Sequence, residues 1–356
     1  MLTKLINYPI WKNDGKEVVP LSNFQKEVIE NFNTKIKERK YTFVNNPCLC
    51  GNSNRDLDIL ISEKDRYGIP CENLLCKKCG LIRLRERLDD YSTEEFYKNE
   101  YRDIYVGKET ASEEFFDSQV QRGQIFLKLV SKYLDIPTVE NVFEIGCGAG
   151  GILYPFHKIG KEVSGCDLGE KYLKFGRAKG LDLYEGEIDL IKIPKESQDL
   201  IILSHVMEHF TDPIVKILQI IEHIKPDKYL LVEVPGIFDI PKTYINPILY
   251  FQNAHVHNYY YYYLKVFFET LGLEVIYGNE RCTFLLKKPT NWVKKEINII
   301  FENKLGDYAS IIEHELKKYY LQHLLKLNPY YYKNILIRFL GLLGLKEPIK
   351  FLLGKK

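Results

Sequence analysis

The sequence predicts a doubly wound α/β fold, in which seven mostly parallel strands form one sheet with helices on both faces. An apolar strand at residues 142–145 breaks into a glycine loop at 146–151. A second apolar strand ends in Asp167, about 20 residues beyond that loop. Apolar strands and helical segments then alternate to about residue 290, a pattern typical of parallel sheets.

Length and composition leave room for a smaller module beside this domain. The chain has 356 residues, of which 45% are hydrophobic and 28% charged, as in ordinary globular proteins. Its 50 basic and 48 acidic residues give a net charge of +2, so we expect no nucleic-acid partner. The eight cysteines fit a reducing compartment, and neither a signal peptide nor a membrane-spanning apolar run is visible. We therefore expect a cytoplasmic protein.

The first 110 residues divide into an arm and a cysteine-containing module. Residues 1–45 form the arm, with one charged helix from about Asn23 to Lys40. In residues 46–110, two short cysteine hooks each end in a glycine, which permits a tight turn around an ion. The candidate zinc ligands are Cys48, Cys50, Cys76 and Cys79.

This zinc-ribbon-like arrangement would hold structural Zn²⁺ with no open coordination position. The first hook is one residue shorter than usual, and Cys71 is a fifth candidate that could replace Cys48 or simply pack. The alternative is a set of free thiols in a loop-rich segment.

The glycine loop predicts a ligand that contains a ribose. Apolar residues at helical spacing in 111–136 lead into the first strand of the main domain, which we place at residues 111–290. Glycines let the backbone approach a ligand closely, and Asp167 stands where doubly wound folds hold a ribose diol. Gly146, Gly148 and Gly151 also fit the dinucleotide pattern, which is weak on its own. Glu144 suits a ligand with an ammonium and a sulfonium better than a pyrophosphate.

The fourth strand, 199–204, runs into a segment that carries a family resemblance. Residues 205–213 read His-Val-Met-Glu-His-Phe-Thr-Asp-Pro. Over about residues 120–290 the chain resembles the class I S-adenosylmethionine-dependent methyltransferases, which have a Rossmann-like sheet. The resemblance implies S-adenosylmethionine as cofactor, with Asp167 on the ribose and an acidic residue after the third strand on the adenine. The implied cofactor-binding residues are Glu144, Gly146, Cys147, Gly148, Asp167, Glu187, Ile188 and His205, with Asp189 as an alternative to Glu187.

A second resemblance concerns the N-terminal module. Residues 65–70, the second hook and residues 97–105 are similar to bacterial methyltransferases that carry a zinc-binding domain ahead of the catalytic one. Many of those are implied to act on sugars in surface-polysaccharide or related pathways. The large C-terminal domain of the sugar C-methyltransferases has no counterpart after residue 290, which favours O-methylation.

Histidines are the candidate bases, since their pKa lies near neutrality. Residues 254–259 resemble the family's loop beside the acceptor pocket, so His255 is preferred, followed by His257, with His209 as a further candidate. The alternative is that these histidines cap helices or bind loop carbonyls. A sharper hypothesis is that His205, Glu208, His209 and His255 bind Mg²⁺ or Mn²⁺, as in some class I O-methyltransferases with a similar motif.

The remaining segments complete the expected architecture. Strands at 274–277 and 282–286 should form an antiparallel hairpin that closes the sheet. Residues 291–356 form a helical extension, with amphipathic candidates at 312–327 and 334–345. The second of these is apolar and followed by lysines, so it either packs on protein or lies on the inner membrane face.

We therefore expect a methyltransferase whose acceptor is a small molecule or glycan. The alternatives are an RNA methyltransferase that uses the cysteine module to grip its target, a non-catalytic cofactor-binding module, and an NAD oxidoreductase. Near-neutral net charge counts against RNA, and an intact glycine loop with Asp167 counts against a non-catalytic module.

Overall fold

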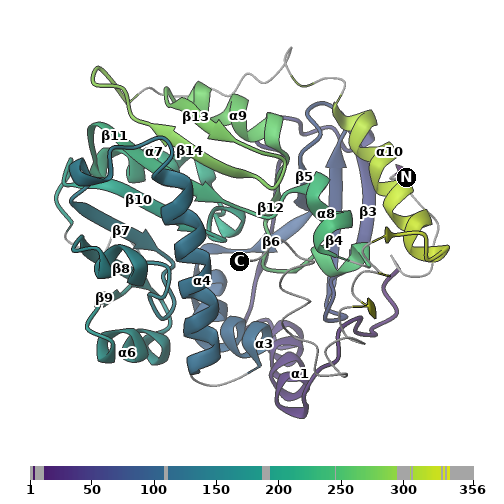
Figure 1. Cartoon of the computed structure of the whole chain (residues 1–356). Helices are drawn as coiled ribbons and strands as arrows, with labels where there is room; N and C mark the ends of the chain where they lie inside the picture. Colours follow the sequence, from purple (N-terminus) through teal and green to yellow (C-terminus); the bar gives the residue numbers. More distant parts are fainter. Residues whose placement is uncertain are drawn as a thin grey trace.

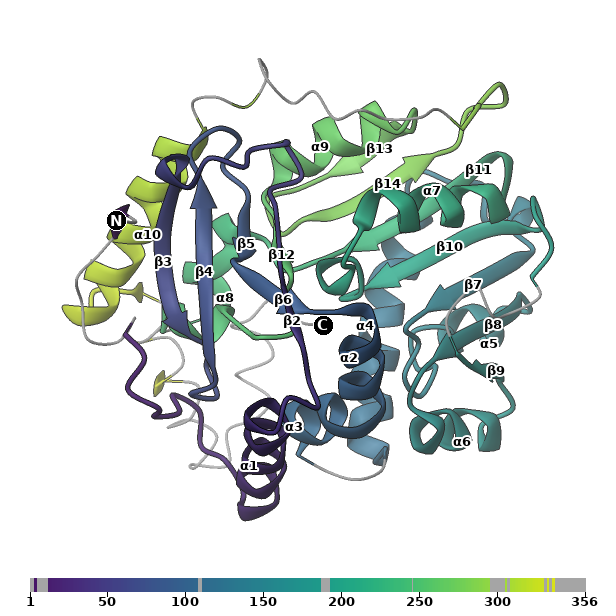
Figure 2. The same ribbon diagram turned by 180° about the vertical axis from the view of Figure 1, so that it is seen from behind.

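Two sheets lie side by side in the computed structural model (Figures 1 and 2). The structure describes residues 3–4, 12–107, 111–186, 193–244, 246–294, 305, 308–329, 332 and 335–336. We call the smaller sheet and the helices beside it the N-terminal module, and the larger one the main sheet.

The main sheet confirms the doubly wound prediction. Its strands are β7 (Asn141–Ile145), β8 (Glu162–Asp167), β9 (Asp182–Glu185), β10 (Gln198–Ser204), β11 (Ile224–Glu233), β13 (Glu274–Gly278) and β14 (Thr283–Lys287). Their order is β13-β14-β11-β10-β7-β8-β9, and within the described chain only β14 runs antiparallel to its neighbours. The expected closing hairpin is therefore present. Successive strands are added on one side of β7 and then on the other, so the β7–β10 junction is the switch point where such folds bind ligands.

Alternating side chains bury both faces of this sheet. Val142 and Leu200 point to one face and Phe143 and Ile201 to the other, as the period of two in a strand requires. The first face is covered by α4 (Glu113–Val130), α5 (Tyr154–Lys158) and α6 (Glu170–Ala178). The second is covered by α7 (Pro213–His223) and α9 (Tyr261–Thr270).

The N-terminal module contains a five-stranded sheet of order β1-β3-β4-β5-β12. Its strands are β1 (Thr3–Lys4), β3 (Asp58–Lys64), β4 (Pro70–Cys76), β5 (Ile82–Leu84) and β12 (His257–Asn258). A separate two-stranded antiparallel sheet pairs β2 (Phe43–Asn45) with β6 (Glu86–Leu88). Because β12 comes from the segment between β11 and α9, the chain returns from the main sheet to complete the smaller one.

Helices of the module lie below its sheet in Figure 2. They are α1 (Asn23–Lys37), α2 (Asp90–Phe96), a π-turn η3 (Tyr97–Tyr101) and α3 (Arg102–Val106). The helix expected in the N-terminal arm is confirmed. It begins where Ser22 and Gln25 form a capping box, with Ser22 Oγ accepting from the Gln25 N–H at 3.2 Å.

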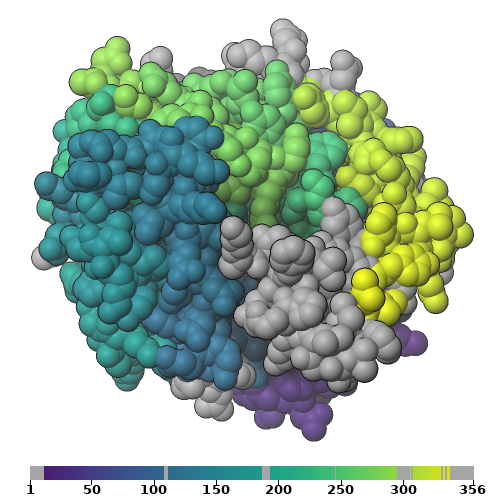
Figure 3. All heavy atoms as spheres, viewed as in Figure 1, coloured from purple at the N-terminus to yellow at the C-terminus, as the bar shows by residue number. Residues whose placement is uncertain are grey.

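One apolar core joins the two sheets. It contains Ile61 and Leu75 of the module, Phe143 and Ile201 of the main sheet, and Ile312 of α10 (Tyr308–Leu324). Figure 3 shows α10 at the edge of the molecule away from the main sheet. This helix confirms the first of the two expected C-terminal helices, while the second, 334–345, lies outside the described residues except for 335–336.

Single helical turns connect the larger elements. They are η2 (Arg55–Leu57), η4 (Ile136–Thr138), η6 (Met207–His209), η7 (Ile237–Asp239), α8 (Ile240–Thr243) and η8 (Pro247–Tyr250). Among the helices described, none is both long and apolar enough to cross a membrane.

Candidate active site and cysteine cluster

The glycine loop at the switch point requires glycine at three positions, among them Gly150 with a φ angle of +74°. Gly146 and Gly148 have φ angles of +71° and +56°, which L side chains rarely adopt. A Cβ on Gly146 would also lie 2.4 Å from Cγ2 of Val206, so the loop following β10 packs directly on this loop. The N–H groups of Gly146 and Cys147 donate to the Cys166 carbonyl at 2.8 and 3.0 Å, which ties the loop to the end of β8.

Asp167 ends β8 and faces this loop. It is 6% exposed, and its carboxylate accepts from the N–H of Gly148 at 2.9 Å and of Gly169 at 2.8 Å. The structure therefore holds the predicted ribose-binding carboxylate in a fixed orientation against the glycine loop.

Glu144 lies beneath the loop in β7 and is 1% exposed. Its Oε2 atom has no hydrogen-bond partner among the described residues. Burial, assisted by the nearby charge of Asp167, raises the pKa of Glu144 well above its usual range. A buried, unpartnered carboxyl group is suited to a cationic ligand group, as the sequence analysis proposed.

Sequence analysis missed two polar residues that cover the loop. Arg102 of α3 binds the Asp167 carboxylate and lies over the Tyr172 ring at 5.1 Å. Gln119 of α4 donates to the Cys147 carbonyl at 3.1 Å and accepts from the Gly151 N–H at 3.3 Å. Arg102 lies within residues 97–105, which carry part of the family resemblance, but the sequence pattern there does not indicate which carboxylate the arginine contacts.

Glu208, in the turn η6 that follows β10, is the centre of an imidazole cluster formed with His205, His209 and His255. It is 1% exposed, and neither carboxylate oxygen has a hydrogen-bond partner in the described part of the chain. Three imidazole nitrogens surround its Oε1 atom: His205 Nδ1 at 3.4 Å, His209 Nε2 at 3.9 Å and His255 Nε2 at 4.0 Å. The four residues singled out as a metal site therefore do come together.

The orientation of His209 is fixed through its second nitrogen. Nδ1 lies 2.9 Å from the Ala254 carbonyl, an acceptor, so Nδ1 carries the proton and Nε2 the lone pair of the neutral ring. Nε2 faces the Tyr101 hydroxyl at 3.4 Å. Burial lowers the pKa of His209, which keeps this lone pair available near neutral pH.

The other two candidate bases are more deeply buried. His255 is 3% exposed, and its Nε2 accepts from the Gln252 amide at 3.0 Å. His257 is fully buried in β12 and is not part of the imidazole cluster. Burial lowers the pKa of His257 to about 3, so this ring is neutral at physiological pH.

His205 occupies a strained position at the end of β10. Its φ is +57°, uncommon for a residue with a side chain and often found at functional sites. Its Nε2 lies 3.6 Å from Oε1 of Glu233, the last residue of β11. The side chain is 45% exposed, and partial desolvation of the ring lowers its pKa, but Glu208 and Glu233 outweigh that effect and raise the pKa of His205 to about 9.

Two predicted cofactor residues, Glu187 and Ile188, lie outside the described residues, as does the alternative Asp189. Their roles stay predictions.

Comparison with known proteins adds the family context. Residues 116–277 match the family model described as a methyltransferase domain. This span holds the glycine loop, Asp167 and the imidazole cluster. The chain therefore contains a methyltransferase domain.

Solved structures that match part of the chain include three S-adenosylmethionine-dependent methyltransferases. That of Mesorhizobium loti is 21% identical over 32% of this chain and 53% of its own, with a TM-score of 0.29. That of Aquifex aeolicus is 19% identical over 46% and 87%, with a TM-score of 0.36. That of Archaeoglobus fulgidus is 20% identical over 62% and 90%, with a TM-score of 0.36. The match thus spans about half of the Mesorhizobium loti protein. No curated protein matches the chain.

The four predicted zinc ligands of the module meet in one cluster. The Sγ atoms of Cys48 and Cys79 are 3.5 Å apart, those of Cys48 and Cys50 3.5 Å, and those of Cys50 and Cys76 3.7 Å. A tetrahedral Zn²⁺ with bonds of about 2.3 Å needs sulfur atoms about 3.8 Å apart, so the set fits. Cys71 is not in this cluster and lies beside Asn73.

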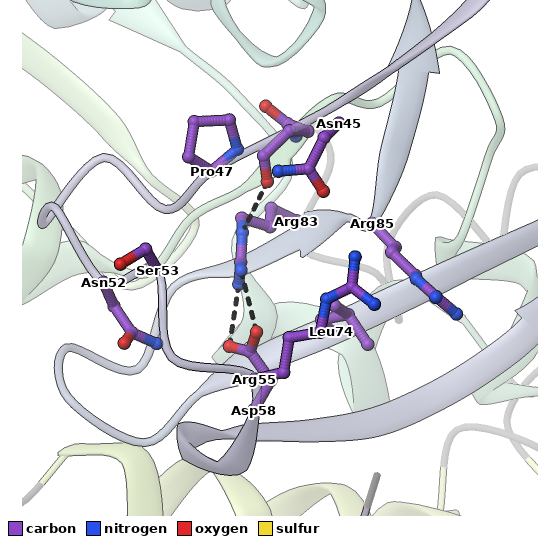
Figure 4. Close-up of a pocket in the computed structure, with 10 residues that line it drawn as sticks. Asn45, Pro47, Asn52, Ser53, Arg55, Asp58, Leu74, Arg83 and Arg85 are labelled. Carbon is purple, nitrogen blue, oxygen red and sulfur yellow. Dashed lines mark hydrogen bonds and ion pairs between the residues drawn. The ribbon is translucent and has the colours of Figure 1, made fainter. Parts of the chain in front are cut away.

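Beside the cysteine cluster, a small cavity of about 60 Å³ opens in the module (Figure 4). Arg83 spans it, donating to both oxygens of Asp58 at 3.0 and 2.9 Å and to the Asn46 carbonyl at 3.0 Å. None of its lining residues comes from the methyltransferase domain. This ion pair braces the start of β3 near the cluster.

The module also holds the loop that carries His255. Asp65, fully buried in the β3–β4 turn, accepts from the Asn253 N–H at 3.2 Å, while the Arg66 N–H donates to the Phe251 carbonyl at 3.1 Å. Ala254, which orients His209, and His255 follow directly. Asp65 therefore helps to position this loop of the methyltransferase domain from outside that domain.

We expect the substitution Asp65→Asn to loosen this loop. The amide oxygen can still accept from Tyr67 and Ile69, but its NH₂ group would face the Asn253 N–H. Hydrogen exchange at Asn253 should quicken by about 10-fold or more. Measurement at pH 8 keeps the wild-type carboxylate ionised, since burial raises the pKa of Asp65 to about 7. Asp89→Asn, which preserves a helix cap, is the control; unchanged exchange in Asp65→Asn would contradict the role.

Proposed function

We propose that this protein is an S-adenosylmethionine-dependent O-methyltransferase acting on a sugar or glycan. The observation that carries this proposal is the pairing of Asp167 with a glycine loop at the switch point, with the unpartnered Glu144 beneath it. One carboxylate can accept both hydroxyls of a ribose, and a buried carboxyl suits an ammonium. An NAD pyrophosphate would gain nothing from Glu144.

The chemistry divides between the two sides of the switch point. S-adenosylmethionine would supply an electrophilic methyl carbon, so the protein must position an acceptor hydroxyl and remove its proton. We propose His209 as that base, because Ala254 fixes its tautomer with the lone pair on Nε2. His255 packs edge-on against it, with ring centroids 5.0 Å apart, and would orient it.

The sugar or glycan acceptor rests on the sequence resemblance and stays a prediction. The cytoplasmic location, which rests on the cysteine pattern, and contact of the apolar, lysine-flanked C-terminal segment with a membrane also stay predictions. RNA is the alternative acceptor. The near-neutral net charge of +2 speaks against it, since nucleic-acid binding relies on excess Lys and Arg.

Cofactor binding tests the central claim. Calorimetric titration should show that the wild-type protein binds S-adenosylmethionine and that Asp167→Asn binds it about 10- to 100-fold more weakly, because a charged acceptor is lost. Asp182→Asn, at the exposed start of β9, should bind as the wild type does. Absence of binding by the wild type would refute the function, and equal binding by Asp167→Asn would refute the assigned role.

For the cysteine cluster we propose a structural Zn²⁺, because four buried thiols at tetrahedral spacing leave no open ligand position. Elemental analysis should find one zinc per chain in the wild type and in Cys71→Ser. Cys79→Ser should lose the zinc and unfold at lower temperature, since the metal stabilises the module. Zinc retained in full by Cys79→Ser would show that the cluster is not its site.

A second candidate mechanism uses a divalent ion at Glu208, His209 and His255, whose ligand atoms all lie within 4.8 Å of one another. Mg²⁺ or Mn²⁺ there would lower the pKa of the acceptor hydroxyl. If so, chelation should abolish methyl transfer, added Mg²⁺ or Mn²⁺ but not Zn²⁺ should restore it, and Mn²⁺ should give a bound spectrum by electron paramagnetic resonance that Glu208→Gln lacks. Methyl transfer indifferent to chelators would leave His209 acting as an unassisted base.

A further inference from the structure

Three cationic side chains converge on Glu233 at the carboxyl edge of the main sheet. Arg122 of α4 reaches its Oε1 atom at 3.2 Å, and His205 reaches the same atom at 3.6 Å. Arg281, from the turn between β13 and β14, lies 3.9 Å from Oε2. Thr283 Oγ1 donates to Oε2 at 2.6 Å. These groups come from three stretches of chain that are distant in sequence: α4, the end of β10, and the start of β14 with the turn before it.

The cations exceed what a single buried carboxylate needs. Burial alone would raise the pKa of Glu233, but His205, Arg122 and Thr283 hold it at about 2, so this group is fully ionised. No other hydrogen bond or ion pair of Arg122 or Arg281 is found within the described ranges. Each guanidinium has five N–H donors, so most of them are free to bind a ligand.

The charge of Arg281 also acts on Arg122. The pKa of Arg122 is lowered, chiefly by burial and further by the charge of Arg281. Like charges brought together in a partly buried place are unfavourable unless an anion joins them. Glu233 neutralises one of the three positive charges, and Glu208 faces a second through His205, which leaves one positive charge in excess.

These cationic side chains, Arg122, Arg281 and His205, form a cationic site that adjoins both the imidazole cluster and the glycine loop. His205 belongs to both groups, with Nδ1 toward Glu208 and Nε2 toward Glu233. The next residue, Val206, packs on Gly146 of the glycine loop. The site is open to a ligand, because the side chain of Arg281 is 49% exposed and that of His205 is 45% exposed.

We propose that Arg122, Arg281 and His205 bind an oxyanion group, a phosphate or a carboxylate, carried by the methyl acceptor. This deepens the proposed function and rests on it, because it narrows the acceptor to an acidic sugar, either phosphate-linked or bearing a carboxylate. Guanidinium groups bind both oxyanions with paired, charge-assisted hydrogen bonds. The anion would fix the acceptor so that one hydroxyl faces His209.

Binding of two simple probes to the full-length protein tests this site. Inorganic pyrophosphate represents the phosphate source and glucuronate the carboxylate source. At low salt, calorimetry should detect at least one of them, and the dissociation constant should rise about 10-fold or more in Arg281→Gln and in Arg122→Gln. Lys228→Gln removes a cation from the opposite end of β11, where it pairs with Asp199 at 3.4 Å, and should leave the affinity unchanged.

The outcomes of this experiment test the oxyanion site separately from the proposed methyltransferase function. Binding of pyrophosphate alone identifies a phosphate-linked sugar as the acceptor, and binding of glucuronate alone identifies a sugar that bears a carboxylate. Failure of both probes, or equal affinity in Arg281→Gln and the wild type, overturns the site. Because neither probe requires the cofactor, a protein that binds them normally but not S-adenosylmethionine would retain this site while losing the proposed function.

Discussion

The arrangement of the site depends on one segment of the methyltransferase domain, residues 249–258, that the N-terminal module holds in place. Its last two residues pair with β5, and its centre is bound to the β3–β4 turn through Asp65 and Arg66. From this position the carbonyl of Ala254 orients His209. A loop on a surface is normally mobile, but this one is fixed by backbone hydrogen bonds on both sides. The precision of the imidazole cluster thus originates outside the methyltransferase domain, and the module that contains the cysteine cluster contributes to it directly.

Charge is divided across the switch point. On the side of β7 and β8, the buried carboxyl groups at the ligand edge are Glu144 and Asp167, and Asp167 is paired with Arg102. The two carboxyl groups suit a cofactor with a diol and two cationic centres. On the side of β10 and β11, Arg122, Arg281 and His205 surround Glu233. The strained backbone of His205 stands at the boundary. Its imidazole lies between the carboxylates of Glu208 and Glu233. This one strained residue therefore links the imidazole cluster to the cationic site.

Sequence patterns predicted the main sheet well because its information is local. Apolar strands between turn signals defined β7, β8 and β10, and Asp167 followed from its spacing to the glycines. The cysteine hooks likewise carry their geometry in short motifs. By contrast, Arg102 on Asp167 and Arg122 on Glu233 join residues 65 and 111 positions apart, and no local pattern encodes such a pair. No local pattern encodes β12 either. It is a two-residue strand that pairs with β5, where the N-terminal module and the main sheet share one core.

The contact of Arg102 with Asp167 has a consequence for cofactor binding. A carboxylate offers about four lone-pair positions. In Asp167 two of these accept from the Gly148 and Gly169 N–H groups, and a third accepts from Arg102. A ribose diol needs two more, one for each hydroxyl. Under the proposed function the two glycine bonds can stay, since they orient the carboxylate, and the Arg102 bond must give way. Arg102 lies at the junction of a π-turn and α3, so a shift of this short helical segment would open the ribose position without disturbing the main sheet.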